Sequence, residues 1–176
     1  MSKFLVIAEK PSVAQSYAKN LSAYKREDGY LEGESCIVSW CLGHLAEYAQ
    51  PEEYDPKYEK WQFDDLPILP EAWKLKVSKD KKKQFDVLKG LMNRSDVEYL
   101  VNGCDAGREG ELIFQRVYVL AGCRKPVKRL WISSMEDAAI QKGFQTMKSE
   151  EEYKNLCMAA AVSYTHLRAH ETSLHL

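Results

Sequence analysis

Short apolar runs alternate with amphipathic stretches along this chain, which is the pattern of a domain built from both strands and helices. The run from Phe4 to Ala8 contains no polar residue, as expected for a strand buried on both faces of a sheet. Val97 to Val101 and Val127 to Ile132 predict two similar strands, and Ser35 to Leu45 predicts another that stops near Gly43. Buried strands of this kind predict a mainly parallel sheet.

The stretches that separate the strands have the spacing of amphipathic helices. Pro11 suits the first turn of a helix that ends near residue 23. Further helices are predicted over Lys81 to Arg94, Arg108 to Ala121, Met135 to Met147 and Glu150 to Val162. Because strands and helices alternate, we expect an α/β domain with a mainly parallel sheet.

Changes in pattern divide the chain into three parts. Residues 1–150 carry most of the alternation and are predicted to form one domain, and residues 151–162 continue the last predicted helix. Within the first domain, residues 49–73 hold four of the six prolines and several aromatic residues, which predicts an ordered excursion rather than a flexible linker. Residues 163–176 hold three of the four histidines and are interpreted as a tail that is not native sequence, with an unusual natural tail as the alternative.

Composition limits the class of protein. The 176 residues include 25 Lys and Arg against 26 Asp and Glu, so the formal net charge of −1 gives no overall attraction to nucleic acid. Five scattered cysteines without a Cys-x-x-Cys pair, and no leader segment, predict a reducing, cytoplasmic location and argue against zinc. No apolar run approaches the roughly 20 residues that span a bilayer, so we expect no membrane association.

Acidic residues directly follow two of the predicted strands. Glu9 and Lys10 come after the first strand. Asp105 comes after the strand that begins at residue 97, with Glu109 and Glu111 in the first turn of the next helix. In open α/β sheets, ligands bind at the carboxyl ends of the strands, so these side chains are expected at one edge. Carboxylate oxygens suit Mg²⁺, which commonly meets a phosphate as well.

A simpler interpretation of these acidic residues stays open. Carboxylates in the first turn of a helix commonly act as caps that the helix dipole favours. Two features favour a metal and phosphate site instead. Gly107 and Gly110 keep the backbone accessible, and Lys10 and Arg108 can neutralise phosphate charge. The residues alone therefore leave a metal and phosphate site and a capped helix start as alternatives.

Six short blocks stand in a fixed order along the chain. They are Leu5 to Ala14, Gly43 to Leu45, Tyr54 to Tyr58 with Trp61, Leu66 to Pro70, Asp105 to Ile113, and Arg129 to Ser134. Together they resemble the Toprim domain of type IA DNA topoisomerases, in the branch of bacterial topoisomerase III. The resemblance spans about residues 1–162. It implies a Toprim (Rossmann-like) domain over residues 1–150, with a mainly parallel sheet flanked by helices, and the start of a following helical domain over residues 151–162. The acidic block alone would suit any Toprim protein.

The resemblance implies roles for individual residues. Glu9 corresponds to the family's acid/base glutamate near the scissile phosphate, and Lys10 to a neighbouring lysine that stabilises transition-state charge. The family motif Asp-x-Asp-x-Glu falls on Asp105, Gly107 and Glu109, so its second aspartate is absent. Asp105 and Glu109, completed by Glu9 or water, are then the expected ligands of Mg²⁺ or Mn²⁺, with an affinity below that of the full motif.

Other residues are considered for contact with DNA. His44 lies in the Gly-His-Leu block and is expected near DNA, although a histidine packed in a turn is the alternative. Arg108 is expected to bind phosphate rather than only to pair with a nearby acid. The run from Lys79 to Lys83 could follow a DNA backbone, but a lysine run is more often a solvated face. Trp131 is expected in the core.

By the resemblance, the whole enzyme cuts one DNA strand with a tyrosine that becomes joined to the 5′ phosphate, passes another strand and reseals the break. None of the ten tyrosines lies in the matching context, so we expect this chain to be the N-terminal part of a longer enzyme and inactive alone. The expected partners are single-stranded or negatively supercoiled DNA and the remaining domains, on a bacterial nucleoid or plasmid. A stand-alone Toprim nuclease and a non-catalytic nucleic-acid-binding module are the alternatives.

Overall fold

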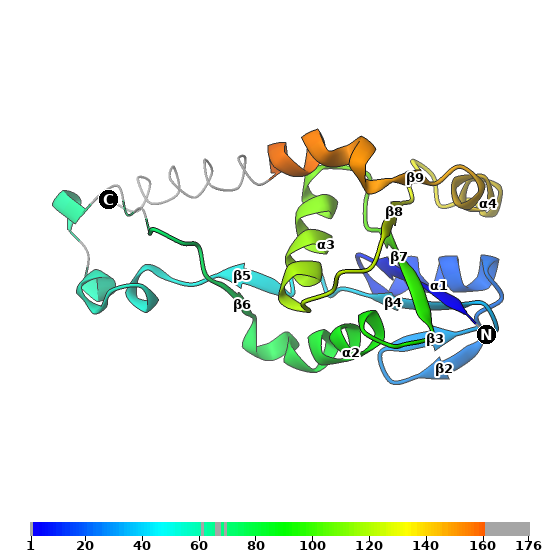
Figure 1. Ribbon diagram of the computed structural model, residues 1–176, viewed down its shortest axis with the longest axis horizontal. Helices are drawn as coiled ribbons and strands as arrows, with labels where there is room; N and C mark the ends of the chain where they lie inside the picture. Colours follow the sequence, from blue (N-terminus) through cyan, green and yellow to red (C-terminus); the bar gives the residue numbers. More distant parts are fainter. Residues whose placement is uncertain (1, 61, 66–67, 69, 161–176) are drawn as a thin grey trace.

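A seven-stranded sheet forms the centre of the protein (Figure 1). The structure is a computed structural model that describes residues 2–60, 62–65, 68 and 70–160. The strand order is β2-β3-β4-β1-β7-β8-β9. The strands are β1 (Lys3–Ala8), β2 (Lys25–Glu27), β3 (Tyr30–Glu32), β4 (Cys36–Trp40), β7 (Val97–Gly103), β8 (Val127–Arg129) and β9 (Lys148–Ser149).

The central part of this sheet is parallel and its edges are antiparallel. Strand β1 pairs in parallel with β4 on one side and with β7 on the other, and β7 pairs in parallel with β8. At one edge β2, β3 and β4 pair in antiparallel fashion, and at the other edge β9 runs antiparallel to β8. The predicted α/β fold with a mainly parallel sheet is confirmed.

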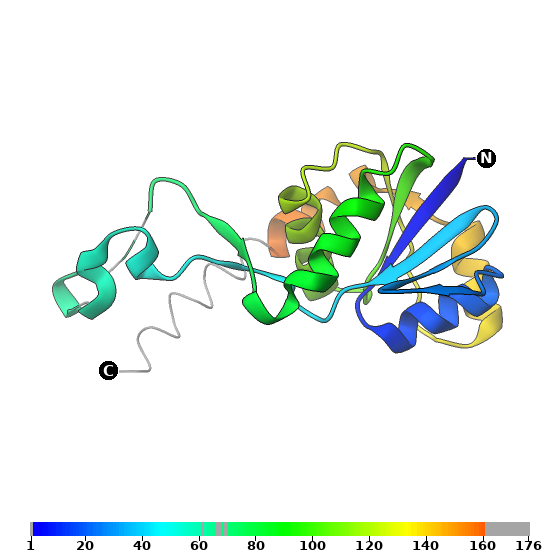
Figure 2. The same ribbon diagram turned by 90° about the horizontal axis from the view of Figure 1, so that it is seen from below.

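Helices cover both faces of the sheet (Figure 2). They are α1 (Pro11–Asn20), α2 (Lys82–Met92), α3 (Arg108–Leu120) and α4 (Asp137–Gln145). Helices α2 and α3 pack on one face and α1 and α4 on the other. All four were expected from periodicity, with ends that differ by a few residues.

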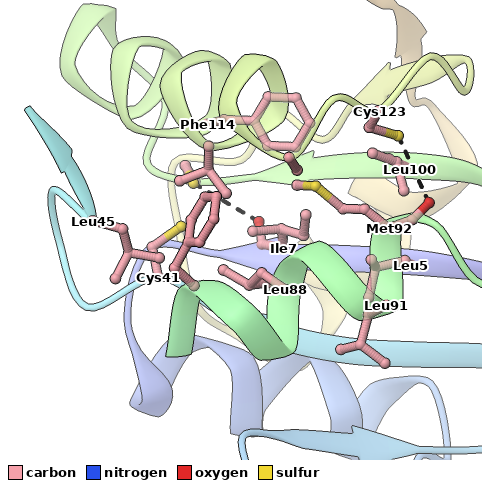
Figure 3. Close-up of a cluster of buried hydrophobic side chains, with 14 of the residues drawn as sticks. Leu5, Ile7, Cys41, Leu45, Leu88, Leu91, Met92, Leu100, Phe114 and Cys123 are labelled. Carbon is pink, nitrogen blue, oxygen red and sulfur yellow. Dashed lines mark hydrogen bonds between the residues drawn. The ribbon is translucent and has the colours of Figure 1, made fainter. Parts of the chain in front are cut away.

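Each face of the sheet has its own apolar core. On the α2 and α3 face, Leu5 and Ile7 of β1 meet Leu88 of α2 and Phe114 of α3, all of them fully buried (Figure 3). On the opposite face, the alternate β1 residues pack against α1 and α4. Every side chain from Leu5 to Ala8 is completely buried, which agrees with the uninterrupted apolar run.

The described residues between 46 and 77 form an arm that projects from the sheet (Figure 1). Its base is a two-stranded antiparallel sheet of β5 (Ala46–Tyr48) and β6 (Leu75–Val77), and the 3₁₀ helices η1 (Pro51–Glu53), η2 (Pro56–Lys60) and η3 (Phe63–Asp65) follow β5. Trp73 packs on Tyr48 with ring centroids 5.3 Å apart. The predicted excursion is ordered over its described residues, whereas Trp61 and most of the Leu66 to Pro70 block lie outside them.

Two expectations for the end of the chain need correction. Strand β8 ends at Arg129, so Trp131 lies beyond it and is 42% exposed rather than part of the core. The predicted last helix begins as a 3₁₀ turn, η5 (Glu150–Tyr153), followed by helical residues 154–160. The interpreted tail, residues 163–176, falls outside the described residues. Within the described part of the chain, no helix is both long and apolar enough to cross a membrane.

Candidate functional site

Strand register brings the predicted acidic residues to one edge of the sheet. Ala8, the last residue of β1, stands opposite Trp40 of β4 and Gly103 of β7. Glu9 therefore leaves the sheet between the ends of its two neighbours, and Asp105 leaves β7 two residues after the paired Gly103. The expectation that Glu9 and Asp105 share one sheet edge is confirmed.

Glu9 is held by the loops on either side of it. The Asp105 backbone N–H donates to Glu9 Oε2 over 3.3 Å. The Gly43 N–H donates to the Glu9 carbonyl oxygen, also over 3.3 Å. Gly43 has φ +64°, a left-handed conformation that glycine adopts without strain. The Gly-His-Leu block thus forms a turn directly beside the first acidic residue.

The acidic loop between β7 and α3 depends on one glycine and leaves another open. A Cβ atom at Gly110 would lie 2.1 Å from the Asp105 carbonyl oxygen, so only glycine lets the start of α3 approach this backbone. Gly107 stands at the N-cap of α3 with an extended backbone, and a Cβ there would meet nothing within 4 Å. The position where the family motif has its second aspartate is therefore sterically free.

The His44 side chain lies beside Glu109, another acidic residue of this edge. Its Nε2 lies 3.4 Å from Glu109 Oε1. Its carbonyl oxygen accepts a hydrogen bond from Lys81 Nζ over 3.0 Å. His44 Nδ1 is buried and has no partner among the described residues. The His44 side chain is thus placed beside a proposed ligand, which leaves its predicted DNA contact as a proposal.

The two predicted phosphate contacts lie at helix starts on this edge. Lys10 is exposed at the N-cap of α1, and Arg108 is the exposed first residue of α3. Most lysines of the run over residues 79–83 have partners within the protein. Lys81 Nζ donates to the His44 carbonyl oxygen, Lys82 pairs with Asp86, and Lys83 pairs with Asp28 of the β2–β3 turn. These pairings agree with the solvated-face interpretation of the run.

Glu111, in the first turn of α3, is buried, whereas Asp105 and Glu109 are exposed. Its side chain is 1% exposed and forms an ion pair with Nε of the equally buried Arg129. Glu111 Oε2 also accepts from Asn102 Nδ2 over 3.3 Å. Sequence reasoning did not identify Arg129 as a site residue. Its position within a predicted strand, at the sheet edge where the acidic loop begins, could have indicated it.

The remaining carboxylates influence one another electrostatically. Partial burial raises the pKa of the Glu9 carboxyl above its ordinary value, and the negative charges of Asp105 and Glu109 raise it further. The Asp105 N–H and the Lys10 ammonium act in the opposite direction without cancelling this rise. A raised pKa makes a carboxyl group a better proton donor and acceptor at the pH where cells work than an ordinary carboxyl group is.

The donor set suits a hard divalent cation held in an open site. Glu9, Asp105 and Glu109 offer only carboxylate oxygens, and their mutual repulsion is the kind that a bound cation relieves. Among the described residues, no group of three or more acidic, histidine or cysteine side chains that could hold a metal ion is found, so these carboxylates would need water and phosphate oxygens as further ligands. Mg²⁺ fits an open set because it keeps several waters and takes phosphate oxygens as further ligands.

Comparison with known proteins shows which family the chain resembles. Residues 4–135 match the family model of the Toprim domain. The chain is 49% identical over 160 residues to DNA topoisomerase 3 of Bacillus subtilis and 50% identical over 160 residues to that of Bacillus cereus. These alignments cover 91% of this chain but only 22% of each relative, so the chain spans about a fifth of their length.

A solved structure supports the fold independently. Full-length topoisomerase I from Thermotoga maritima superposes with a TM-score of 0.53 over 82% of this chain and 21% of that one, at 18% sequence identity. Because the Toprim family model matches residues 4–135, which is more than half of the chain, this chain belongs to the Toprim domain family, and it is similar to the DNA topoisomerase 3 relatives.

Proposed function

We propose that this chain is the metal-binding Toprim part of a type IA DNA topoisomerase of the topoisomerase III kind. The observation that carries the proposal is the meeting of Glu9 and Asp105 at one sheet edge, through the bond from the Asp105 N–H to Glu9 Oε2. The two residues are 96 positions apart in the sequence. Only the fold brings together the blocks that resemble the family.

Each site residue has a proposed role. Glu9, Asp105 and Glu109 hold Mg²⁺, for which Mn²⁺ can substitute. The bound ion supplies charge stabilisation at a phosphate oxygen. Glu9 also moves a proton at the oxygen that leaves the scissile phosphate, which its raised pKa favours. Lys10 neutralises charge on the same phosphate.

The DNA contacts of this edge are proposed as well. Arg108 binds a neighbouring phosphate from the exposed start of α3. His44 contacts the DNA beside Glu109, within the turn that Gly43 and Lys81 hold in place. The substrate is single-stranded or negatively supercoiled DNA in a bacterial cytoplasm, on the nucleoid or a plasmid. Strand cleavage, passage and religation need a tyrosine supplied from outside these residues.

The division of the chain follows from the same proposal. Residues 1–150 form the Toprim domain, residues 151–162 begin a helical domain, and residues 163–176 are a non-native tail. The partners are the remaining domains of the same enzyme, which the greater length of the relatives supports. The next experiment tests two parts of the proposal at once: magnesium as the cofactor and topoisomerase III as the kind of enzyme.

A chimaera tests the proposal directly. The matching 160-residue segment of Bacillus subtilis DNA topoisomerase 3 is replaced by the aligned residues of this chain. The chimaera should relax supercoiled plasmid with Mg²⁺. Glu9→Ala should lower the cleavage rate by about 10² to 10⁴, the usual value of proton transfer to a leaving group. Glu98→Ala, an exposed acid on β7, is the matched control and should change nothing. A folded chimaera that relaxes no DNA, or that tolerates Glu9→Ala, would overturn the proposal.

A further inference from the structure

One buried guanidinium holds the backbone of the acidic loop. Arg129 Nη1 donates to the carbonyl oxygens of Asn102 and Cys104 over 3.0 and 2.7 Å, and Nη2 donates to that of Asp105 over 2.8 Å. Its Nε pairs with Glu111. The planar fork of arginine can serve all these acceptors at once, whereas a lysine ammonium is a single point charge.

The carbonyl of Asp105 is fixed from two sides. Arg129 binds it from β8, and Gly110 of α3 leaves just enough room for it on the other side. The amides of this loop are bonded as well, because the Cys104 N–H donates to Asn102 Oδ1 over 3.1 Å and the Asp105 N–H donates to Glu9. The direction in which the Asp105 carboxylate leaves the backbone therefore depends on where the guanidinium of Arg129 lies.

A half-exposed aromatic pair covers this guanidinium. The Arg129 Cζ atom lies 5.1 Å from the centroid of the Trp131 ring. Trp131 in turn stacks on Tyr153 of η5, with centroids 5.3 Å apart and planes at 17°. Arg129 is only 1% exposed, although Trp131 is 42% exposed. A tryptophan at the surface thus separates a buried cation from water, which strengthens the electrostatic contacts that the cation makes.

We propose that Trp131 and Tyr153 are positioning residues for the acidic loop, acting through Arg129. The pair lies beyond the end of β8 and does not belong to the apolar cores. By covering the guanidinium, it keeps Arg129 on the carbonyls of Asn102, Cys104 and Asp105. The proposal deepens the proposed function, because the loop it holds carries a proposed metal ligand. It also couples η5 to the site, since a shift of Tyr153 moves the ring that covers Arg129.

The test compares two half-exposed tryptophans that each pack against a tyrosine ring, Trp131 stacked on Tyr153 and Trp73 tilted against Tyr48. Trp131→Ala removes the cover of Arg129, and Trp73→Ala on the arm, at 48% exposure, is the matched control. Hydrogen exchange of the Cys104 and Asp105 amides is followed in the isotope-labelled chain. Trp131→Ala should accelerate both by about tenfold, because local opening of the loop becomes easier. Trp131→Phe should restore most of the protection, and Trp73→Ala should leave it unchanged.

Binding of Mn²⁺ provides a second readout that general destabilisation does not move. Trp131→Ala should weaken Mn²⁺ binding by about threefold or more, and Trp73→Ala should not, even where their melting temperatures fall equally. If Trp131→Ala fails to fold, Tyr153→Ala takes its place with the same expectations. Two results would overturn the inference. One is an equal effect of Trp131→Ala and Trp73→Ala, and the other is an unchanged exchange rate of the Cys104 and Asp105 amides in Trp131→Ala. If the parent chain binds no Mn²⁺, the proposed function fails, while the exchange comparison still decides this inference.

Discussion

Replacing Gly107 by aspartate restores a carboxylate where the family motif has one, and we expect tighter binding of divalent ions. The structure permits the change, because a Cβ at this position meets nothing within 4 Å and the backbone is extended. The same position is the N-cap of α3, where aspartate is among the favoured residues. The substitution therefore adds charge to the site without displacing a neighbour.

The size of the effect follows from simple electrostatics. A carboxylate about 5 Å from a divalent ion, in a site with the dielectric constant of bulk water, has an attractive Coulomb energy of about 1.7 kcal/mol. Ordering the new side chain costs about 0.5 kcal/mol, which leaves about 1.2 kcal/mol. That free energy corresponds to roughly eightfold tighter binding. Direct coordination would increase the gain, because the ion and the oxygen would then be closer.

Isothermal titration of the chain with Mn²⁺ measures this difference. Gly90→Asp in α2 is the control, because it adds the same charge at another position where a Cβ meets nothing within 4 Å. Gly107→Asp should bind Mn²⁺ roughly eightfold more tightly than the parent, and Gly90→Asp should match the parent. Unchanged affinity in Gly107→Asp, or an equal gain in both variants, would refute the assignment of Gly107 as the missing ligand position.

Three further outcomes are expected. Gly110→Ala should lower the free energy of unfolding by about 1–3 kcal/mol, because its Cβ meets the Asp105 carbonyl. Gly90→Ala, where a Cβ meets nothing within 4 Å, should raise the free energy of unfolding by about 0.5–1 kcal/mol. Thermal unfolding measures both changes. The Arg94 guanidinium holds the pKa of Glu32 below its ordinary value, so the stability from this pair is present above the unfolded pKa of about 4.3 and is lost as the pH falls below it. Glu32→Gln should therefore flatten the acid-unfolding curve in that range. The chain alone, mixed with supercoiled plasmid and Mg²⁺, should give neither relaxed DNA nor a covalent adduct on a denaturing gel, and nicks without an adduct would favour the nuclease.

The central strands could be predicted because burial on both faces leaves an unmistakable apolar run, as in Phe4 to Ala8. The antiparallel edge could not be found in this way, because β2 reads Lys-Arg-Glu and no residue of β2 or β3 is fully buried. A turn signal was nevertheless present, since Asp28-Gly29 is a typical hairpin pair and Gly29 has φ +85°. Strands β5 and β6 pair across a long excursion, which local pattern cannot indicate.

The acidic edge could be predicted because parallel strands end together, which places Glu9 beside Asp105 in any such sheet. What holds that edge could not be predicted. Arg129 is charged and Trp131 apolar, so burial rules favour an exposed arginine and a buried tryptophan. The structure reverses both, because the guanidinium satisfies loop carbonyls and Glu111 while the indole ring covers it. Which of these two side chains is buried depends on contacts between segments that are distant in the sequence.

The most direct test of the central claim is to locate a bound paramagnetic ion in this chain. Traces of Mn²⁺ added to the isotope-labelled protein broaden the amide signals of nearby residues. The account predicts that the amides of Glu9, Asp105 and Glu109 disappear first, and that Asp105→Asn removes the effect while leaving the fold intact. Broadening that begins instead at another acidic segment, such as η3 (Phe63–Asp65) of the arm, or that survives Asp105→Asn unchanged, would contradict a metal site at this edge.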